Sequence, residues 1–72
     1  MFERVGAWEV NVGLGAATAV KVSGPDRGRR TSVTVQRFPV GYRVGKDWST
    51  PVPKSVQQAA ERMLRKLTGE RR

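Results

Sequence analysis

Cysteine and histidine are both absent from this 72-residue chain. Without cysteine, no disulfide and no thiolate–metal bond can hold a small fold together. Without histidine, the chain lacks the commonest general base and the commonest metal ligand. The two absences exclude hydrolytic triads, Cys–His nucleophiles and zinc sites.

Long apolar runs are absent as well. No stretch approaches the roughly 20 apolar residues that cross a bilayer, and residues 1–5 lack the charged and apolar regions of a signal peptide. We therefore expect a cytoplasmic protein with no membrane partner. The six carboxylates are scattered, without a spacing typical of acid–base catalysis. The sequence accordingly predicts no enzyme activity, no cofactor and no metal.

Positive charge is what the chain has in excess. Fourteen Lys and Arg residues against six Asp and Glu give a net charge of +8. Such an excess indicates a polyanionic partner, although charge by itself carries no specificity. The length predicts one small basic domain over residues 1–72. A chain this short buries only about 60% of its unfolded surface.

Apolar and polar residues alternate over residues 8–14, 18–23 and 31–36, as in strands with one buried face. Pro39 interrupts the alternation, because proline cannot donate to a strand ladder. The pattern resumes over residues 40–44, which predicts a short fourth strand or a kinked extension of the third. The valines expected to form the sheet's part of the core are Val10, Val12, Val20, Val22, Val33 and Val35.

The clearest periodic signal follows a proline-containing linker. Apolar residues recur at i, i+3, i+4, i+7, i+8 and i+11, namely at Val56, Ala59, Ala60, Met63, Leu64 and Leu67. This stripe predicts a helix over about residues 53–68 with Gly69 as its stop. The helix begins either at a capping box that starts at Ser55 or with Pro53 in its first turn. Residues 69–72 are expected to fray.

Together these elements predict an α+β fold. An antiparallel three- or four-stranded β-meander within residues 4–47 packs on one C-terminal α-helix. One helix covers only one face of a sheet, which leaves the other face to water, a ligand or a second subunit. A homodimer is therefore among the expected assemblies.

Basic residues gather in the turn-rich segment Gly24–Arg30. Guanidinium groups in this segment would bind phosphates, because each offers a fork of hydrogen-bond donors that matches the phosphate oxygens. The alternative is that the loop serves only to keep the protein soluble. Basic and aromatic residues interleave over residues 37–43, which suits a single-stranded nucleic acid and equally a protein interface. The predicted nucleic-acid-binding residues are Lys21, Arg27, Arg29, Arg30, Arg37, Phe38, Tyr42 and Arg43.

The basic hairpin Gly24–Arg30 and the helix Ser55–Leu67 resemble parts of two DNA-binding architectures. Three strands and a helix resemble the integrase arm-binding and AP2 types of DNA reader. Four strands and a helix resemble the PC4 type of single-stranded DNA binder, which pairs through its helix. Both resemblances imply an α+β fold and DNA binding, and neither assigns site residues to this chain.

The sequence thus predicts a small nucleic-acid-binding protein that contacts the phosphates of DNA or RNA through its basic hairpin loop. The alternative is a small regulator or inhibitor that binds an acidic protein. Such a protein would use the uncovered sheet face or the bend Phe38–Tyr42.

Overall fold

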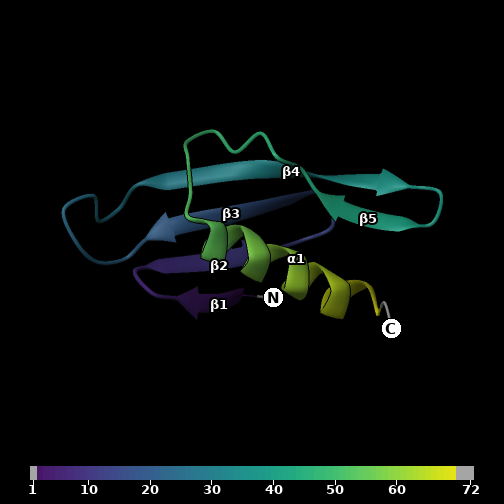
Figure 1. The fold of residues 1–72 in the computed structure, drawn as a ribbon, viewed down its shortest axis with the longest axis horizontal. Helices are drawn as coiled ribbons and strands as arrows, with labels where there is room; N and C mark the ends of the chain where they lie inside the picture. The colour runs from purple at the N-terminus through teal and green to yellow at the C-terminus, as the bar shows by residue number, and fades with distance from the viewer. Residues whose placement is uncertain (1, 70–72) are drawn as a thin grey trace.

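The structure, a computed structural model, describes residues 2–69. Five strands form one antiparallel sheet in chain order, and a helix follows them (Figure 1). The predicted α+β meander with a C-terminal helix is confirmed, but the prediction of three or four strands is wrong. Residues 70–72 of the tail expected to fray lie outside the described part. The elements are β1 Phe2–Val5, β2 Trp8–Val12, β3 Ala16–Lys21, β4 Arg30–Phe38, β5 Gly41–Val44 and α1 Lys54–Thr68.

The additional strand is β1, which begins before the predicted strand region 4–47. It pairs with β2 so that Val5 lies opposite Trp8, and Gly6 and Ala7 form the two-residue turn between them. Gly6 has φ 57°, a left-handed conformation that glycine adopts without steric cost at the first position of such a turn. Residues 2–5 do not alternate, because the apolar Phe2 and Val5 lie on opposite faces of the strand, which is why the sequence did not predict β1.

A hairpin turn, and not a bend within a strand, accounts for the break at Pro39. Phe38 lies opposite Gly41, so Pro39 and Val40 form the two-residue connection between β4 and β5. Proline suits this place because it has a fixed φ and no N–H to contribute to a ladder. The predicted short fourth strand is confirmed as β5.

The hydrophobic core lies between α1 and one face of the sheet (Figure 1). The helix packs mainly on β2 and β5 and also contacts β1. Its stripe is buried as predicted except for Leu67, which is 38% exposed. The buried apolar residues of the sheet are Trp8, Val10, Val12, Ala17, Ala19, Val33, Val35 and Val44.

The expectation that Val20 and Val22 belong to the core is wrong. The register places Ala17 and Ala19 of β3 opposite the buried Val12 and Val10, so these two alanines lie on the sheet face that α1 covers, whereas Ala16 is exposed. Val20 consequently lies on the other face, half-buried, and Val22 follows the end of β3. A β-branched side chain favours a strand whichever face it occupies, so strand propensity did not identify the buried face.

The two ends of α1 differ from each other in how they are capped. Pro53 is the N-cap residue and makes no side-chain hydrogen bond, so the capping box starting at Ser55 is not formed. Gly69 is the C-cap residue with φ 73°, and its N–H reaches the carbonyl oxygens of Arg65 and Lys66. The predicted glycine stop is therefore confirmed.

The linker between β5 and α1 covers the part of the β4 edge that β5 leaves unpaired. The Ser49 N–H donates to the Ser32 carbonyl oxygen at 2.9 Å. The Thr50 N–H donates to Oγ1 of Thr31 at 2.8 Å, and Thr31 Oγ1 also lies 2.9 Å from Ser49 Oγ. Thr31 is buried, so this network gives a buried hydroxyl its partners and holds the linker against the sheet.

Within residues 2–69, no helix is both long enough and apolar enough to span a bilayer.

Candidate nucleic-acid interface

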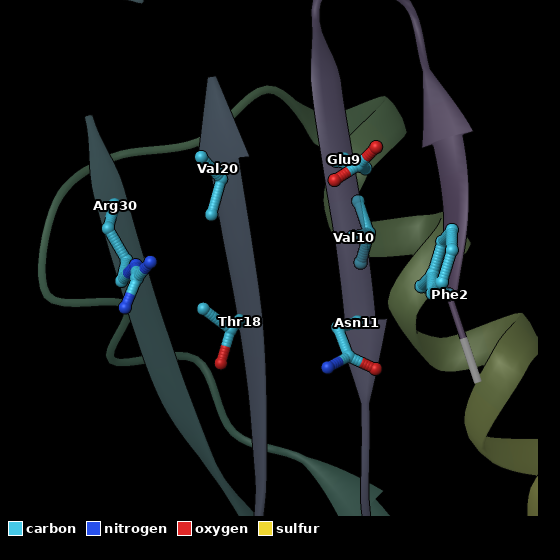
Figure 2. A pocket seen from close by; sticks show the side chains of 7 residues that line it. All are labelled: Phe2, Glu9, Val10, Asn11, Thr18, Val20 and Arg30. Carbon is cyan, nitrogen blue, oxygen red and sulfur yellow. The ribbon is translucent and has the colours of Figure 1, made fainter. Parts of the chain in front are cut away.

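The sheet face turned away from α1, here called the open face, carries no element of the described chain. Figure 2 shows this face with α1 behind the sheet. The strand register arranges its side chains in cross-strand rows. One row contains Arg4, Glu9, Val20 and Arg30, and the neighbouring row contains Phe2, Asn11, Thr18 and Ser32.

A shallow concavity of about 320 Å³ lies on the open face across β1 to β4 (Figure 2). Phe2 stands at its β1 side and Arg30 at its β4 side. Between them, Asn11 and Thr18 contribute polar groups from the two inner strands. The lining combines one aromatic ring, aliphatic carbon and several hydrogen-bonding groups; it consists of Phe2, Glu9, Val10, Asn11, Thr18, Val20 and Arg30.

The β3–β4 loop is an ordered series of turns that presents arginines to solvent. The Gly28 N–H donates to the Lys21 carbonyl oxygen at 2.7 Å, and the Lys21 N–H donates to the Arg29 carbonyl oxygen at 2.9 Å. Gly28 has φ 97°, a conformation that lets the chain close back onto β3. Arg27 and Arg29 are exposed in this loop, so their guanidinium groups are available on a fixed backbone.

Lys21 belongs to the same end of the molecule but to the other face. It pairs with Trp8 on the side of the sheet that α1 covers, and its ammonium nitrogen lies 5.6 Å from the centre of the Trp8 ring. This cation–π contact holds a half-buried lysine stem over an aromatic face. Arg30, by contrast, begins β4 on the open face and lines the concavity.

The other predicted residues lie on the β4–β5 hairpin, which extends past β2 and β3 (Figure 1). Arg37 pairs with Tyr42, and Tyr42 is half-buried against the core. The Arg43 guanidinium lies 5.1 Å from the centre of the Phe38 ring. Phe38 is 40% exposed, so one side of this stacked pair remains open to solvent.

The predicted site therefore separates into two clusters. The loop cluster comprises Lys21, Arg27, Arg29 and Arg30, and the hairpin cluster comprises Arg37, Phe38, Tyr42 and Arg43. β4 contains nine residues and connects the clusters; the eight steps between its first and last residue span about 26 Å at ~3.3 Å per step. A partner that touches both clusters must extend along most of the molecule, whose longest dimension is 40 Å.

Within residues 2–69, one ion pair is formed, between the Arg62 guanidinium of α1 and the Glu3 carboxylate of β1 at 2.6 Å. Both side chains are partly exposed, so the pair contributes little to stability. Arg65 and Lys66 lie in the last turn of α1, where cations interact favourably with the helix dipole. The arginines of the loop cluster are engaged by no carboxylate in the described chain.

Several side chains of the open face were not predicted as site residues, notably Phe2, Asn11 and Thr18. The alternation after Trp8 does place Asn11 on the face opposite Val10, which was a usable signal. No sequence pattern pointed to Phe2, because its place on the open face depends on its pairing in β1, a strand that was not predicted. In residues 2–69 no three Asp or Glu residues come together to hold a metal ion.

The chain matches no protein-family model, no curated protein and no solved structure.

Proposed function

We propose that this protein binds nucleic acid and contacts phosphates through the loop cluster. The observation that carries the proposal is the presentation of Arg27, Arg29 and Arg30 at one end of the molecule, exposed and without a carboxylate partner in the described chain. Arginine forks match phosphate oxygens in geometry and charge. The net charge of +8 adds long-range attraction for a polyanion.

The order of the loop supports this proposal. Its backbone bonds involving Lys21, Gly28 and Arg29 are made within the protein itself. A loop that is already ordered loses less conformational entropy on binding. Arg30 extends the basic surface from the loop onto the open face, and Arg43 adds positive charge in the separate hairpin cluster at the other end of β4. DNA and RNA both fit these phosphate contacts, and a cytoplasmic location is part of the proposal.

The test is the salt dependence of binding when Arg27, Arg29 and Arg30 are replaced together by Ala. If each guanidinium neutralises one phosphate, the log–log salt slope should fall by about 2.7 on a duplex or about 2.1 on a single strand. Fluorescence anisotropy with labelled oligonucleotides between about 50 mM and 200 mM salt measures this slope. Circular dichroism verifies that the fold is unchanged.

The matched control removes three positive charges from α1 through Lys54→Ala, Arg65→Ala and Lys66→Ala. This variant keeps the Arg62–Glu3 ion pair and the loop cluster. The loop variant should lose much more binding than the helix variant. Equal losses would assign binding to net charge and not to the loop, and absence of salt-dependent binding by the unaltered protein would refute the proposal.

A second candidate function is the binding of an acidic protein, as a regulator or inhibitor. The observation in its favour is Val40, which is 92% exposed at the tip of the β4–β5 hairpin. Arginines and Phe38 flank this tip, a combination that is enriched at protein interfaces. The deciding variant is Val40→Ser, which removes the apolar side chain without adding a charge; it should weaken binding to such a partner and leave the affinity for oligonucleotides within about twofold, because every phosphate-binding charge is kept.

A further inference from the structure

The concavity on the open face has the composition of a site for a flat, polar-edged ring. Phe2 is 70% exposed at its border, so the ring surface of this residue is available to a ligand. Asn11 and Thr18 supply amide and hydroxyl groups from the neighbouring strands. Neither of these polar side chains makes a hydrogen bond within residues 2–69, and both therefore retain their donors and acceptors.

Glu9 gives the concavity a chemistry different from that of the loop cluster. It lies in the same cross-strand row as Arg4 and Arg30, and it forms no ion pair in the described residues. A carboxylate repels a phosphate but accepts hydrogen bonds from amino groups. The part of the concavity between Phe2 and Glu9 is therefore poorly suited to phosphate and well suited to the edge of a base, while Arg30 lines the opposite side.

We propose that the concavity binds an unpaired nucleobase of a single-stranded nucleic acid, with the base stacked on Phe2 and its polar edge facing Asn11 and Glu9. The inference rests on the proposed function, since Arg30 connects the concavity to the phosphate-binding loop cluster. Bases in a duplex are stacked and paired, and extruding one costs a few kcal/mol. A single strand offers its bases without that cost.

The polar lining implies a preference among bases. A carboxylate accepts a hydrogen bond from the exocyclic amino group of cytosine, whereas thymine and uracil carry at that position a carbonyl oxygen, which a carboxylate repels, and donate only through ring N3–H. We expect oligo-dC to bind more tightly than oligo-dT, and both to bind more tightly than a duplex of mixed sequence. An oligo-rC arm measures whether the sugar matters, because the proposal concerns the base and fits DNA and RNA alike.

The decisive variant is Phe2→Ala, measured by anisotropy with labelled oligo-dC of about 12 nucleotides, a length within known site sizes. Loss of one base–aromatic stack should weaken binding at least about fivefold, while Phe2→Tyr keeps the ring and the affinity. Leu14→Ala is the matched control, because it truncates another exposed apolar side chain outside the concavity. Its affinity should stay within about twofold of the unaltered protein, as for other exposed sites.

Glu9→Gln tests whether the Glu9 carboxylate recognises the polar edge of the base, and it leaves the Phe2 ring unchanged. The variant should bring the ratio of oligo-dC affinity to oligo-dT affinity closer to one, because the Gln side chain has an NH2 donor in place of one of the two acceptor oxygens of Glu9. Asn11→Ala provides an independent measurement on an inner strand, in case the edge strand β1 does not tolerate a change at Phe2. Its expected result is weaker oligo-dC binding with an unchanged circular dichroism spectrum.

The outcomes separate this inference from the proposed function. If the duplex binds as tightly as oligo-dC, and Phe2→Ala and Asn11→Ala change nothing, the inference is overturned and phosphate binding by the loop cluster stands. If Phe38→Ala weakens oligo-dC binding while Phe2→Ala does not, the base site is at the hairpin cluster, which also overturns the inference. If no oligonucleotide binds at all, both proposals fail together.

Discussion

At the scale of single residues, close backbone approaches determine which substitutions this small sheet accepts. Gly45 lies where the chain leaves β5 and passes β4, and its N–H donates to the Thr34 carbonyl oxygen at 2.9 Å. A Cβ on Gly45 would lie 2.9 Å from that same oxygen and 3.2 Å from a Val33 methyl. Because one of the close atoms belongs to the backbone, a rotamer change cannot relieve the contact.

We therefore expect Gly45→Ala to lower the free energy of unfolding by about 1–3 kcal/mol, the usual cost of forcing extra atoms into a packed site. Gly15→Ala is the control, because no atom lies within 4 Å of its added Cβ and its φ is outside the left-handed region. That change should be neutral or stabilising by about 0.4–1 kcal/mol. Urea unfolding measures both, and equal midpoints would contradict the prediction.

The buried hydroxyl of Thr31 gives a second prediction at this scale. Thr31→Val keeps the side-chain shape but removes the acceptor of the Thr50 N–H. A part-buried donor left without a partner costs about 1–3 kcal/mol, and the linker should exchange its amide hydrogens faster. Thr34→Val, at an exposed position of the same strand, should change stability by less than about 0.5 kcal/mol. Hydrogen exchange that is equally slow in both variants would refute the role assigned to this network.

At the scale of elements, α1 shows how strongly the fold depends on one interface. Leu64 is 3% exposed and lies between the helix and the sheet. Leu64→Asp buries a carboxylate without a partner and removes apolar contact, at a cost of at least about 3 kcal/mol. A core of this size rarely contributes more than about 3–5 kcal/mol net, so the variant should be largely unfolded.

Leu67→Asp provides the comparison for that variant on the same helix. Leu67 is 38% exposed, so a carboxylate there remains hydrated, and the thermal transition should stay cooperative. Far-UV circular dichroism during heating distinguishes the two variants. A near-normal transition in Leu64→Asp would mean that the core is wrongly assigned.

The elements also differ in how well the sequence predicted them. The helical stripe extends over 12 residues, from Val56 to Leu67, so the period was unambiguous and the predicted limits nearly match Lys54–Thr68. Strands of four to six residues give weaker signals, and the core face of β3 was assigned wrongly because alanines, not valines, face α1. The loop arginines could be predicted from the sequence, because they lie among turn-forming residues in the segment Gly24–Arg30. The concavity could not be predicted, because it depends on the strand register that places Phe2 near Asn11 and Thr18.

At the scale of the whole molecule, the net charge of +8 acts on stability as well as on partners. Repulsion among like charges opposes the compact state and is screened by salt. Raising the salt from about 50 mM to 200 mM should therefore raise the Tm; relief of about 1 kcal/mol corresponds to about 4–8 °C for a domain of this size. The double variant Arg27→Gln with Arg29→Gln should show a smaller rise, and a Tm that falls with salt would contradict the prediction.

Assembly is a further property at this scale, and a homodimer stays a prediction. The apolar stripe of α1 is largely buried against its own sheet, so helix pairing of the PC4 type would bring mostly polar surfaces together. The open face is the remaining candidate for a second copy. Light scattering measures the mass directly, and a dimer on that face should dissociate when a single-stranded oligonucleotide is added.

The position of α1 after all five strands also matters during synthesis. The strands emerge from the ribosome first, with the apolar side chains of β2 and β5 that pack against α1 still uncovered, because the helix residues that bury them lie between Val56 and Leu64. Apolar surface and strand edges exposed in this way favour aggregation, so we expect the nascent meander to be prone to aggregation until the helix has emerged. Messages truncated before the helix codons should yield products that proteases remove rapidly, even though every proposed ligand-binding residue is already present in them.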